Sequence, residues 1–287
     1  MSIVEKAVDK HRRAEPIRSP KEQAAQNDAR VAKGRPLKTP RKPGSVDIEL
    51  DHEKLSREGI TPYTDISETL VDEFRRIKRP LLRAAFEEKA EGVASTAKNI
   101  VLIASALSGE GKTFTAMNLA MSIAMERDRT VVLVDADVAK PHISRMLGVA
   151  HQPGLMDLLQ DHSVDIGEVL LQTDMPSLKI IPAGERHRQA AELLASQRME
   201  AIIEELGTRY SDRIVLFDSP PVLQTSEAQA LASLVGQVLL VVQAGQTPQR
   251  AVLSALELMA EQDVKMVLNK CRLPESSPYY TGYYGYK

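Results

Sequence analysis

Six short runs of β-branched and aliphatic residues recur from residue 99 onward, and a longer stretch separates each run from the next. Most of these longer stretches have the apolar spacing of amphipathic helices. Nearly continuous apolar strands that alternate with helices are typical of a parallel sheet covered on both faces. We therefore predict an α/β fold, a mostly parallel sheet with helices on both faces. The predicted strands are 99–105, 130–135, 178–184, 213–218, 237–243 and 264–269, and the predicted helices are 112–127, 154–160, 190–206, 226–235 and 248–261.

The chain before this alternation has a different character. Residues 1–44 contain twelve Lys and Arg against five Asp and Glu, a net charge of +7, and five prolines interrupt them. Such a basic segment with few large apolar residues is typical of a disordered arm, which we assign to residues 1–60. The arm is a solvated linker or binds an acidic lipid surface or a partner. Residues 65–91 then follow a helical pattern in which Pro80 predicts a break or kink.

Composition and local pattern exclude several classes of protein. The 287 residues carry a net charge of −2, which argues against a protein that coats nucleic acid. Cys271 is the single cysteine, so a disulfide scaffold and a cysteine-only metal cluster are excluded. No apolar run approaches the ~18 residues of a membrane helix, and the N-terminus lacks a signal-peptide pattern, so we expect a cytoplasmic chain. We assign residues 61–273 to one domain and 274–287 to a flexible tail.

The first predicted strand leads into Ala106-Leu107-Ser108-Gly109-Glu110-Gly111-Lys112-Thr113, which a helix follows. This order is that of a Walker A phosphate loop, although Ala106 replaces the first glycine of the strict motif. Glycines let backbone amides curl around a phosphate, and the start of the helix favours negative charge. Lys112 would bridge the β- and γ-phosphates of ATP and Thr113 would bind Mg²⁺. The predicted nucleotide contacts are Ser108, Gly109, Glu110, Gly111, Lys112, Thr113 and Phe114.

Two further predicted strands end in carboxylates, the first at Asp135 and Asp137 and the second at Asp218. Ligands of open parallel sheets bind at the carboxyl ends of the strands, where all three motifs fall. An aspartate that ends one strand is by default a helix cap, but convergence on a phosphate loop favours a Mg²⁺ site. We predict that Asp135 and Asp218 organise the metal with Thr113, and that Lys112, Asp135, Asp137 and Asp218 carry the chemistry.

These motifs resemble those of the bacterial P-loop tyrosine kinases of capsule and exopolysaccharide synthesis, and closest the autokinases linked to exosortase loci. The resemblance covers about 65–287 and rests on SGEGKT, on DAD as a Walker A′ box, on FDSPPVL as a Walker B box and on AELLAS. It implies a protein-tyrosine kinase that uses ATP and Mg²⁺. Ala139 stands where the family often has an arginine after the second box, with Lys140 beside it.

The same resemblance implies partners and contacts. The family's oligomer motif appears as Glu73, Arg76 and Arg79, whose spacing places them along one helix face, and it implies a homo-oligomer, expected as a ring. Asn269, at the end of the last predicted strand, matches the position at which relatives in the same superfamily have an asparagine that contacts adenine. Many relatives fuse the kinase to a membrane domain. Because no membrane helix is expected in this chain, it resembles the split form, in which the kinase and the membrane domain are separate proteins. That form implies a separate transmembrane polysaccharide co-polymerase, a cognate tyrosine phosphatase and recruitment to the inner face of the cell membrane.

The tail contains five of the seven tyrosines, and glycines and prolines keep it extended. We predict that these phenols are phosphoacceptors, that Asp137 is the base, and that the transfer occurs in trans within the oligomer. Two alternatives are a positioning or partitioning ATPase, whose extra loop lysine is replaced here by Leu107, and a nucleotide-gated scaffold without kinase activity. The predicted acceptors are Tyr279, Tyr280, Tyr283, Tyr284 and Tyr286.

Overall fold

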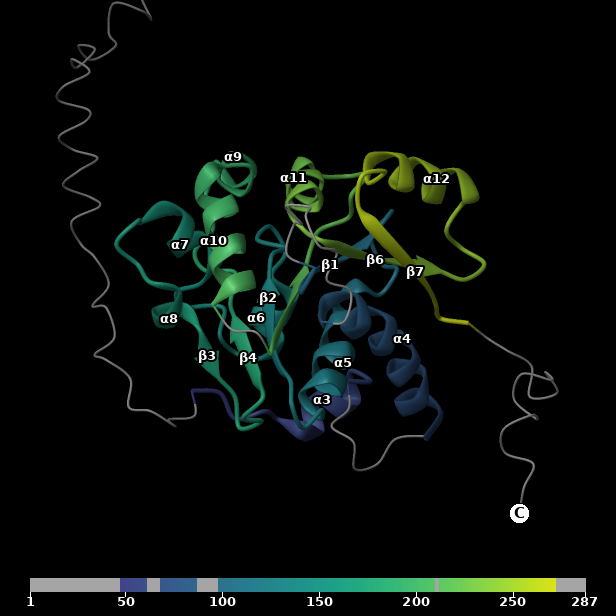
Figure 1. Cartoon of the computed structure of the whole chain (residues 1–287), viewed down its shortest axis with the longest axis horizontal. Coiled ribbons are helices and arrows are strands. Elements are labelled where there is room, and N and C mark those ends of the chain that lie inside the picture. Colours follow the sequence, from purple (N-terminus) through teal and green to yellow (C-terminus); the bar gives the residue numbers. More distant parts are fainter. Residues whose placement is uncertain (1–46, 61–67, 87–97, 210–211, 272–287) are drawn as a thin grey trace, which may run out of the picture. The chain divides into compact units, whose positions relative to one another are not determined.

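The computed structural model describes residues 47–60, 68–86, 98–209 and 212–271. Their centre is a seven-stranded sheet in the order β3-β4-β2-β5-β1-β6-β7, parallel throughout except for the antiparallel pair β3–β4 (Figure 1). Six strands fall on the six predicted apolar runs, which confirms the predicted fold class. The strands are β1 Ile100–Ser105, β2 Thr130–Asp135, β3 Leu171–Gln172, β4 Leu178–Ile181, β5 Arg213–Asp218, β6 Gln237–Gln243 and β7 Asp263–Asn269.

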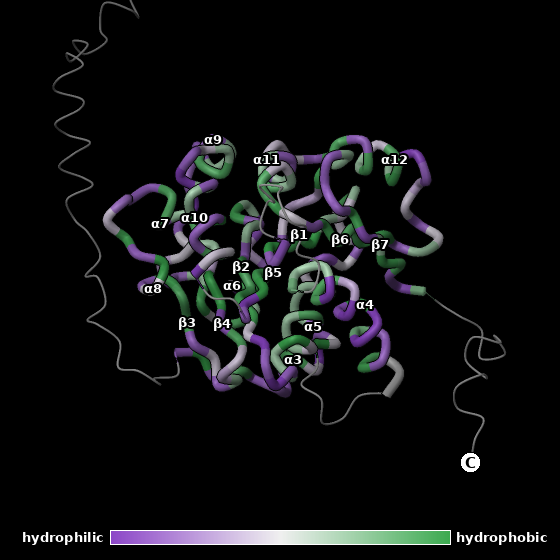
Figure 2. Tube along the Cα trace, in the orientation of Figure 1, coloured by the Kyte–Doolittle hydropathy of each residue, from purple (hydrophilic) through white to green (hydrophobic). Residues whose placement is uncertain are grey.

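Helices cover both faces of the sheet, as the buried strands require. Alternate residues of β1 enter different cores: Ile100 and Leu102 face one layer of helices, whereas Val101 and Ile103 face the other. Strands are hydrophobic along most of their length, whereas α4 alternates in hydropathy (Figure 2). The first layer contains α7 Leu155–Gln160, α8 Ile166–Val169, α9 Ala190–Leu194, α10 Gln197–Thr208, α11 Ser226–Leu234 and α12 Gln249–Leu258, and the second contains α3 His52–Arg57, α4 Glu68–Phe86, α5 Lys112–Ala124 and α6 His142–Met146.

The folded domain begins earlier than the sequence predicts. Residues 47–60, assigned above to the disordered arm, contain α3 and pack on the second core. Asp51 caps α3 by accepting a hydrogen bond from the amide of Lys54 at 2.9 Å. Burial of four apolar side chains explains why this segment is ordered, and the boundary at residue 60 is therefore wrong. The buried side chains are Ile48, Leu50, Leu55 and Ile60.

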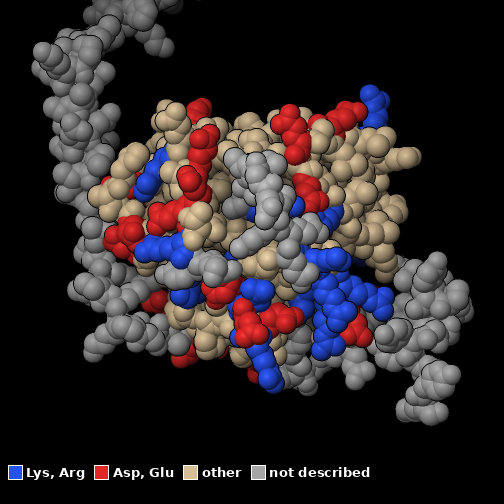
Figure 3. Space-filling view, viewed as in Figure 1, with Lys and Arg blue, Asp and Glu red and all other residues tan. Residues whose placement is uncertain are grey.

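Helix α4 lies against α5 and continues through Pro80, so of the predicted break or kink the break does not occur. Phe74 and Leu81 are buried on its inner side, and the buried Lys78 ammonium donates to the carbonyl of Ser122 at 2.7 Å. The outer side is exposed and carries the motif residues Glu73, Arg76 and Arg79. Lys and Arg side chains gather over this helix (Figure 3). Among the described residues, no helix is both long and apolar enough to cross a membrane.

Candidate active site

The loop between β1 and α5 has the backbone that a phosphate cradle requires. Gly109 and Gly111 have φ angles of +85° and +99°, a region that favours glycine. A Cβ on Gly111 would also lie 2.1 Å from Nδ2 of Asn269, so a larger residue would have to displace this side chain. The sequence places glycines where the chain reverses direction into the start of α5, and the amides of the first turn of that helix are free to bind an anion.

Lys112 is the first residue of α5, and only 8% of it is exposed. Its Nζ donates to Oγ of Ser105, the last residue of β1, at 2.9 Å, and Ser105 donates to the carbonyl of Leu107 at 2.6 Å. Burial lowers the pKa of Lys112, while the negative charges of Asp218, Asp137 and Glu110 oppose this shift. The ammonium group is thus held inside the loop beside the predicted phosphate position.

Asp218 ends β5 and meets the start of α5. Its Oδ2 accepts a hydrogen bond from Oγ1 of Thr113 at 2.8 Å, while its Oδ1 is buried without a hydrogen-bond partner in the protein. Burial, reinforced by the neighbouring Asp135, raises the pKa of Asp218 to about 8. A carboxylate oxygen that is buried and unpaired lacks a donor or a cation.

Asp135 lies directly beside Asp218, because the two residues pair in register at the ends of β2 and β5. Oδ2 of Asp135 accepts hydrogen bonds from the amide and hydroxyl of Ser144, at 2.8 and 2.6 Å, and Oδ1 is again buried and unpaired. Burial raises the pKa of Asp135 to about 6 despite these hydrogen bonds. Two adjacent carboxylates therefore each keep one unsatisfied oxygen.

These unsatisfied oxygens fit a magnesium ion, because Mg²⁺ prefers oxygen ligands and often uses one or two carboxylates with phosphate and water. Thr113 offers a hydroxyl between the loop and Asp218. Among the described residues, no group of three or more His, Cys, Asp and Glu could hold a metal. A magnesium ion here would therefore depend on the nucleotide phosphates and water for its remaining ligands.

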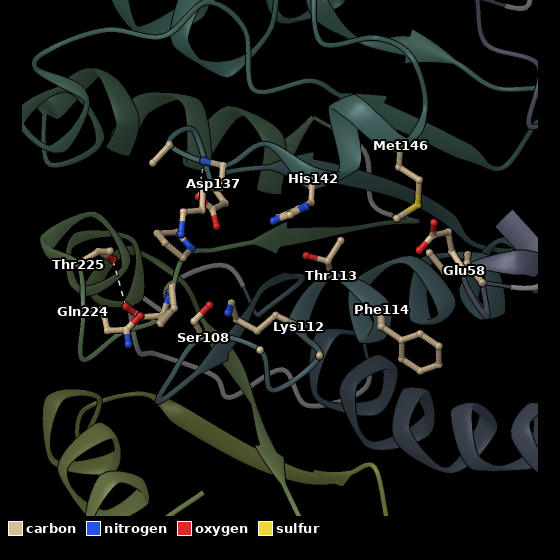
Figure 4. A pocket seen from close by; sticks show the side chains of 17 residues that line it. Glu58, Ser108, Lys112, Thr113, Phe114, Asp137, His142, Met146, Gln224 and Thr225 are labelled. Atoms are coloured by element: carbon tan, nitrogen blue, oxygen red, sulfur yellow. Dashed lines mark hydrogen bonds between the residues drawn. The ribbon is translucent and has the colours of Figure 1, made fainter. Parts of the chain in front are cut away.

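A cavity of about 420 Å³ opens over the phosphate loop (Figure 4). Lys112 and Thr113 enter it from the loop, and Asp137 and His142 enter it from the segment after β2. Asp137 is half-buried and accepts a hydrogen bond from the amide of Lys140 at 2.9 Å. The other lining residues are Glu58, Ile60, Ser108, Gly109, Gly111, Phe114, Ala139, Lys140, Met146, Pro220, Pro221, Gln224 and Thr225.

The structure therefore brings most of the predicted site together. Three residues predicted to contact the nucleotide, Glu110, Phe114 and Asn269, have side chains that contact other parts of the protein. The ring of Phe114 packs 6.3 Å from the ring of Phe74 on α4. The buried carboxylate of Glu110 accepts from the amide of Leu107 at 2.7 Å and from the hydroxyl of Thr247. Asn269 donates to the carbonyl of Glu110 at 2.8 Å, outside the cavity lining.

Sequence reasoning missed Ser105 and Ser144, which hold the predicted lysine and the predicted aspartate. Both are small polar residues beside motif residues, and no local pattern distinguishes them from other serines. The five tail tyrosines predicted to be phosphoacceptors lie outside the described residues.

The loop, the buried lysine and the paired strand-end carboxylates define a P-loop nucleotide-binding domain. The AAA domain family matches residues 98–267. Tyrosine-protein kinase YwqD of Bacillus subtilis (strain 168) is 32% identical over 190 residues, which cover 65% of this chain and 78% of YwqD. The chain therefore belongs to the bacterial tyrosine-protein kinase family.

Two other relatives agree with this assignment. The succinoglycan biosynthesis transport protein ExoP of Rhizobium meliloti (strain 1021) is 32% identical over 230 residues, which cover 76% of this chain and 28% of ExoP. The crystal structure of the VpsO kinase domain is similar with a TM-score of 0.60 and 26% identity, and the match covers 72% of this chain and 95% of that domain. The chain thus spans most of YwqD but little more than a quarter of ExoP.

Proposed function

We propose that this protein is an ATP-dependent tyrosine autokinase that phosphorylates its own C-terminal tyrosines and regulates exopolysaccharide chain length and export. The observation that carries the proposal is that Lys112, Thr113 and Asp137 line one cavity, while Thr113 also donates a hydrogen bond to the buried Asp218. In this proposal Asp135 and Asp218, with their unpaired oxygens, hold Mg²⁺ together with Thr113. The metal, when bound, neutralises charge on the β- and γ-phosphates.

The residues of the chain divide the transfer between them. Lys112 and the loop amides hold the phosphates and stabilise the charge of the transition state. Asp137 lines the cavity, which supports its proposed role as the base that takes the proton of the tyrosine hydroxyl. The phenolic oxygen forms a bond to the γ-phosphorus as the bond to the β–γ bridging oxygen breaks, which releases ADP.

The course of the chain after β7 supports transfer in trans. Lys270 contacts the carbonyl side of the phosphate loop, and neither it nor Asn269 lines the cavity that holds Asp137. The last residues described after β7 are therefore not among those that surround the proposed base. Helix α4 exposes Glu73, Arg76 and Arg79, which we propose contact a second copy in a ring-shaped homo-oligomer.

Phosphorylation would in turn regulate the oligomer. Each phosphotyrosine adds about −1.5 to −2 charges, so full modification of the five tail tyrosines adds roughly −8 to −10 per chain. We propose that this repulsion disperses the ring and that a cognate tyrosine phosphatase restores it. A separate transmembrane polysaccharide co-polymerase would recruit the kinase to the inner face of the cell membrane and activate it.

Phosphate mapping tests the activity. Incubation with Mg-ATP followed by mass spectrometry should give phosphotyrosine within residues 279–286, and Lys112→Met should abolish it without changing the melting temperature greatly. Free phosphate without protein labelling would instead indicate an ATPase, and nucleotide binding with neither product would indicate a scaffold.

A mixing experiment tests the trans mechanism. Full-length Lys112→Met protein is the substrate, and an otherwise unchanged chain that ends at residue 273 is the enzyme. Labelling of the inactive full-length chain is the expected result, and its absence would contradict transfer in trans. Size measurement before and after ATP tests the dispersal of the oligomer.

A further inference from the structure

Two residues at the end of β7 contact the outside of the phosphate loop. Nδ2 of Asn269 donates to the carbonyl of Glu110 at 2.8 Å, and Nζ of Lys270 donates to the carbonyl of Gly109 at 2.6 Å. The Lys270 ammonium also lies 3.3 Å from Oε1 of Gln243, and its backbone amide donates to Oδ1 of Asn269 at 2.8 Å. Two consecutive peptide groups of the loop are thus held from β7, although about 160 residues of sequence separate the partners.

Holding a carbonyl fixes the amide of the same peptide group. The peptide unit is planar and trans, so its C=O and N–H point in opposite directions. The carbonyl of Gly109 shares its peptide unit with the amide of Glu110, and the carbonyl of Glu110 shares its unit with the amide of Gly111. With both carbonyls turned outward to Lys270 and Asn269, both amides point to the opposite side, where P-loops bind phosphate.

The backbone of Lys270 indicates that this contact is maintained at a cost. Its φ of +58° is the only positive value at a residue other than glycine in the described part of the chain. A left-handed conformation is unfavourable for an ordinary residue, whereas glycine would adopt it freely. Lys270 is exposed, so burial of its side chain does not account for a lysine at this position.

We propose that Lys270 is a positioning residue for nucleotide binding: its ammonium turns the Gly109 carbonyl outward and so aims the Glu110 amide at the phosphate. A cation also favours this orientation more strongly than a neutral donor, because hydrogen bonds from charged groups are stronger. The inference rests on the proposed nucleotide binding of the loop and adds a residue outside the Walker motifs to it.

Three substitutions separate the side chain from the backbone. Lys270→Met keeps the stem without the ammonium, Lys270→Arg keeps a charged donor, and Lys270→Gly removes the side chain while it relieves the backbone. Lys265→Met is the control, because Lys265 lies on β7, which ends just before Lys270, but does not contact the loop. Its ammonium lies 2.7 Å from Oδ2 of Asp263 and 3.1 Å from Oε1 of Gln237. The measurements are ADP and ATP affinity with Mg²⁺, the KM for ATP, kcat and the melting temperature.

Lys270→Met and Lys270→Gly should weaken nucleotide affinity and raise KM about tenfold, as expected for loss of one charged hydrogen bond, with a smaller change in kcat. Lys270→Arg should stay near the wild type, and Lys270→Gly should melt at or above the wild-type temperature. Wild-type affinity in Lys270→Gly would overturn the inference, as would an equal loss in Lys265→Met. Failure of the proposed function is distinguishable, because the wild-type chain would then give no phosphotyrosine, while the nucleotide affinities of the variants would still test the role of Lys270.

Discussion

Replacing Asp218 by asparagine removes the carboxyl group whose ionisation the fold makes most unfavourable. Burial and the adjacent Asp135 raise the pKa of Asp218 to about 8, whereas an unfolded aspartate titrates near ~3.9. Between these two pKa values, the folded protein therefore holds a proton on Asp218 that the unfolded chain has released. Because the folded pKa is the higher one, the stabilisation is complete below about pH 4 and is lost as the pH rises through about 8.

The size of this effect follows from the two pKa values. Between pH 6 and pH 8, Asp218 alone should lower the free energy of unfolding by about 2 kcal/mol. For a domain of this size, that change corresponds to about 4–9 °C in melting temperature. The pKa of Asp135 is raised only to about 6, so most of its contribution is already lost below this window.

Magnesium–nucleotide binding should change with pH in the opposite direction. A carboxylate binds Mg²⁺ in its ionised form, and with a pKa of about 8 Asp218 is roughly 1% ionised at pH 6 and half ionised at pH 8. We therefore expect the affinity for Mg-ADP to rise about 50-fold from pH 6 to pH 8, the same range in which the ligand-free protein loses stability.

The assay compares melting in EDTA with titration of a fluorescent ADP in excess Mg²⁺, at pH 6, 7 and 8 and constant ionic strength. Asp218→Asn should lose most of both pH dependences, and the exposed Asp128→Asn should retain them. Parallel pH curves for the wild type and Asp218→Asn in EDTA would refute the reasoning, because they would show that Asp218 does not hold the proton.

Two further predictions concern the phosphate loop. Gly111→Ala should abolish measurable nucleotide binding and lower stability by roughly 2–3 kcal/mol, because the positive φ strains the backbone and the new Cβ displaces Asn269 from its hydrogen bond with the Glu110 carbonyl. Gly109→Ala, with open space around it, should cost only about 1–2 kcal/mol in melting experiments. Thr247→Val should leave the buried Glu110 carboxylate short of a donor, costing about 1–3 kcal/mol by chemical denaturation, and Thr247→Ser should restore most of this. An undisturbed Thr247→Val protein would show that the hydroxyl does not stabilise the loop.

The sheet could be predicted because its strands are buried on both faces and therefore read as continuous apolar runs. Two parts of the fold gave no such signal. Strand β3 is only Leu171–Gln172 and depends on its antiparallel partner β4. In residues 47–60, the four buried apolar side chains are separated by polar and charged residues, so the segment shows no continuous apolar run.

The residues of the site likewise divide into those that local motifs predict and those that they do not. Lys112, Thr113 and Asp218 follow from local motifs, because a strand, a loop and a helix start fix their positions. The contacts of Thr247 with Glu110 and of Lys270 with Gly109 join residues 137 and 161 positions apart. Such pairs depend on which strands become neighbours, and a single sequence does not contain that information in any local pattern.

These contacts imply that the two halves of the site are prepared to different degrees before nucleotide binds. The phosphate half is held without groups that line the cavity: the Glu110 side chain accepts from the Leu107 amide within the loop, and Asn269 and Lys270 contact the loop from the end of β7. The metal half is incomplete, since Asp135 and Asp218 each bury an unpaired oxygen and have raised pKa values. Binding should therefore require little rearrangement of the loop, while the carboxylates release protons as the cation arrives. Proton release that accompanies Mg-ADP binding at pH 7, and is lost in Asp218→Asn, is the measurable consequence.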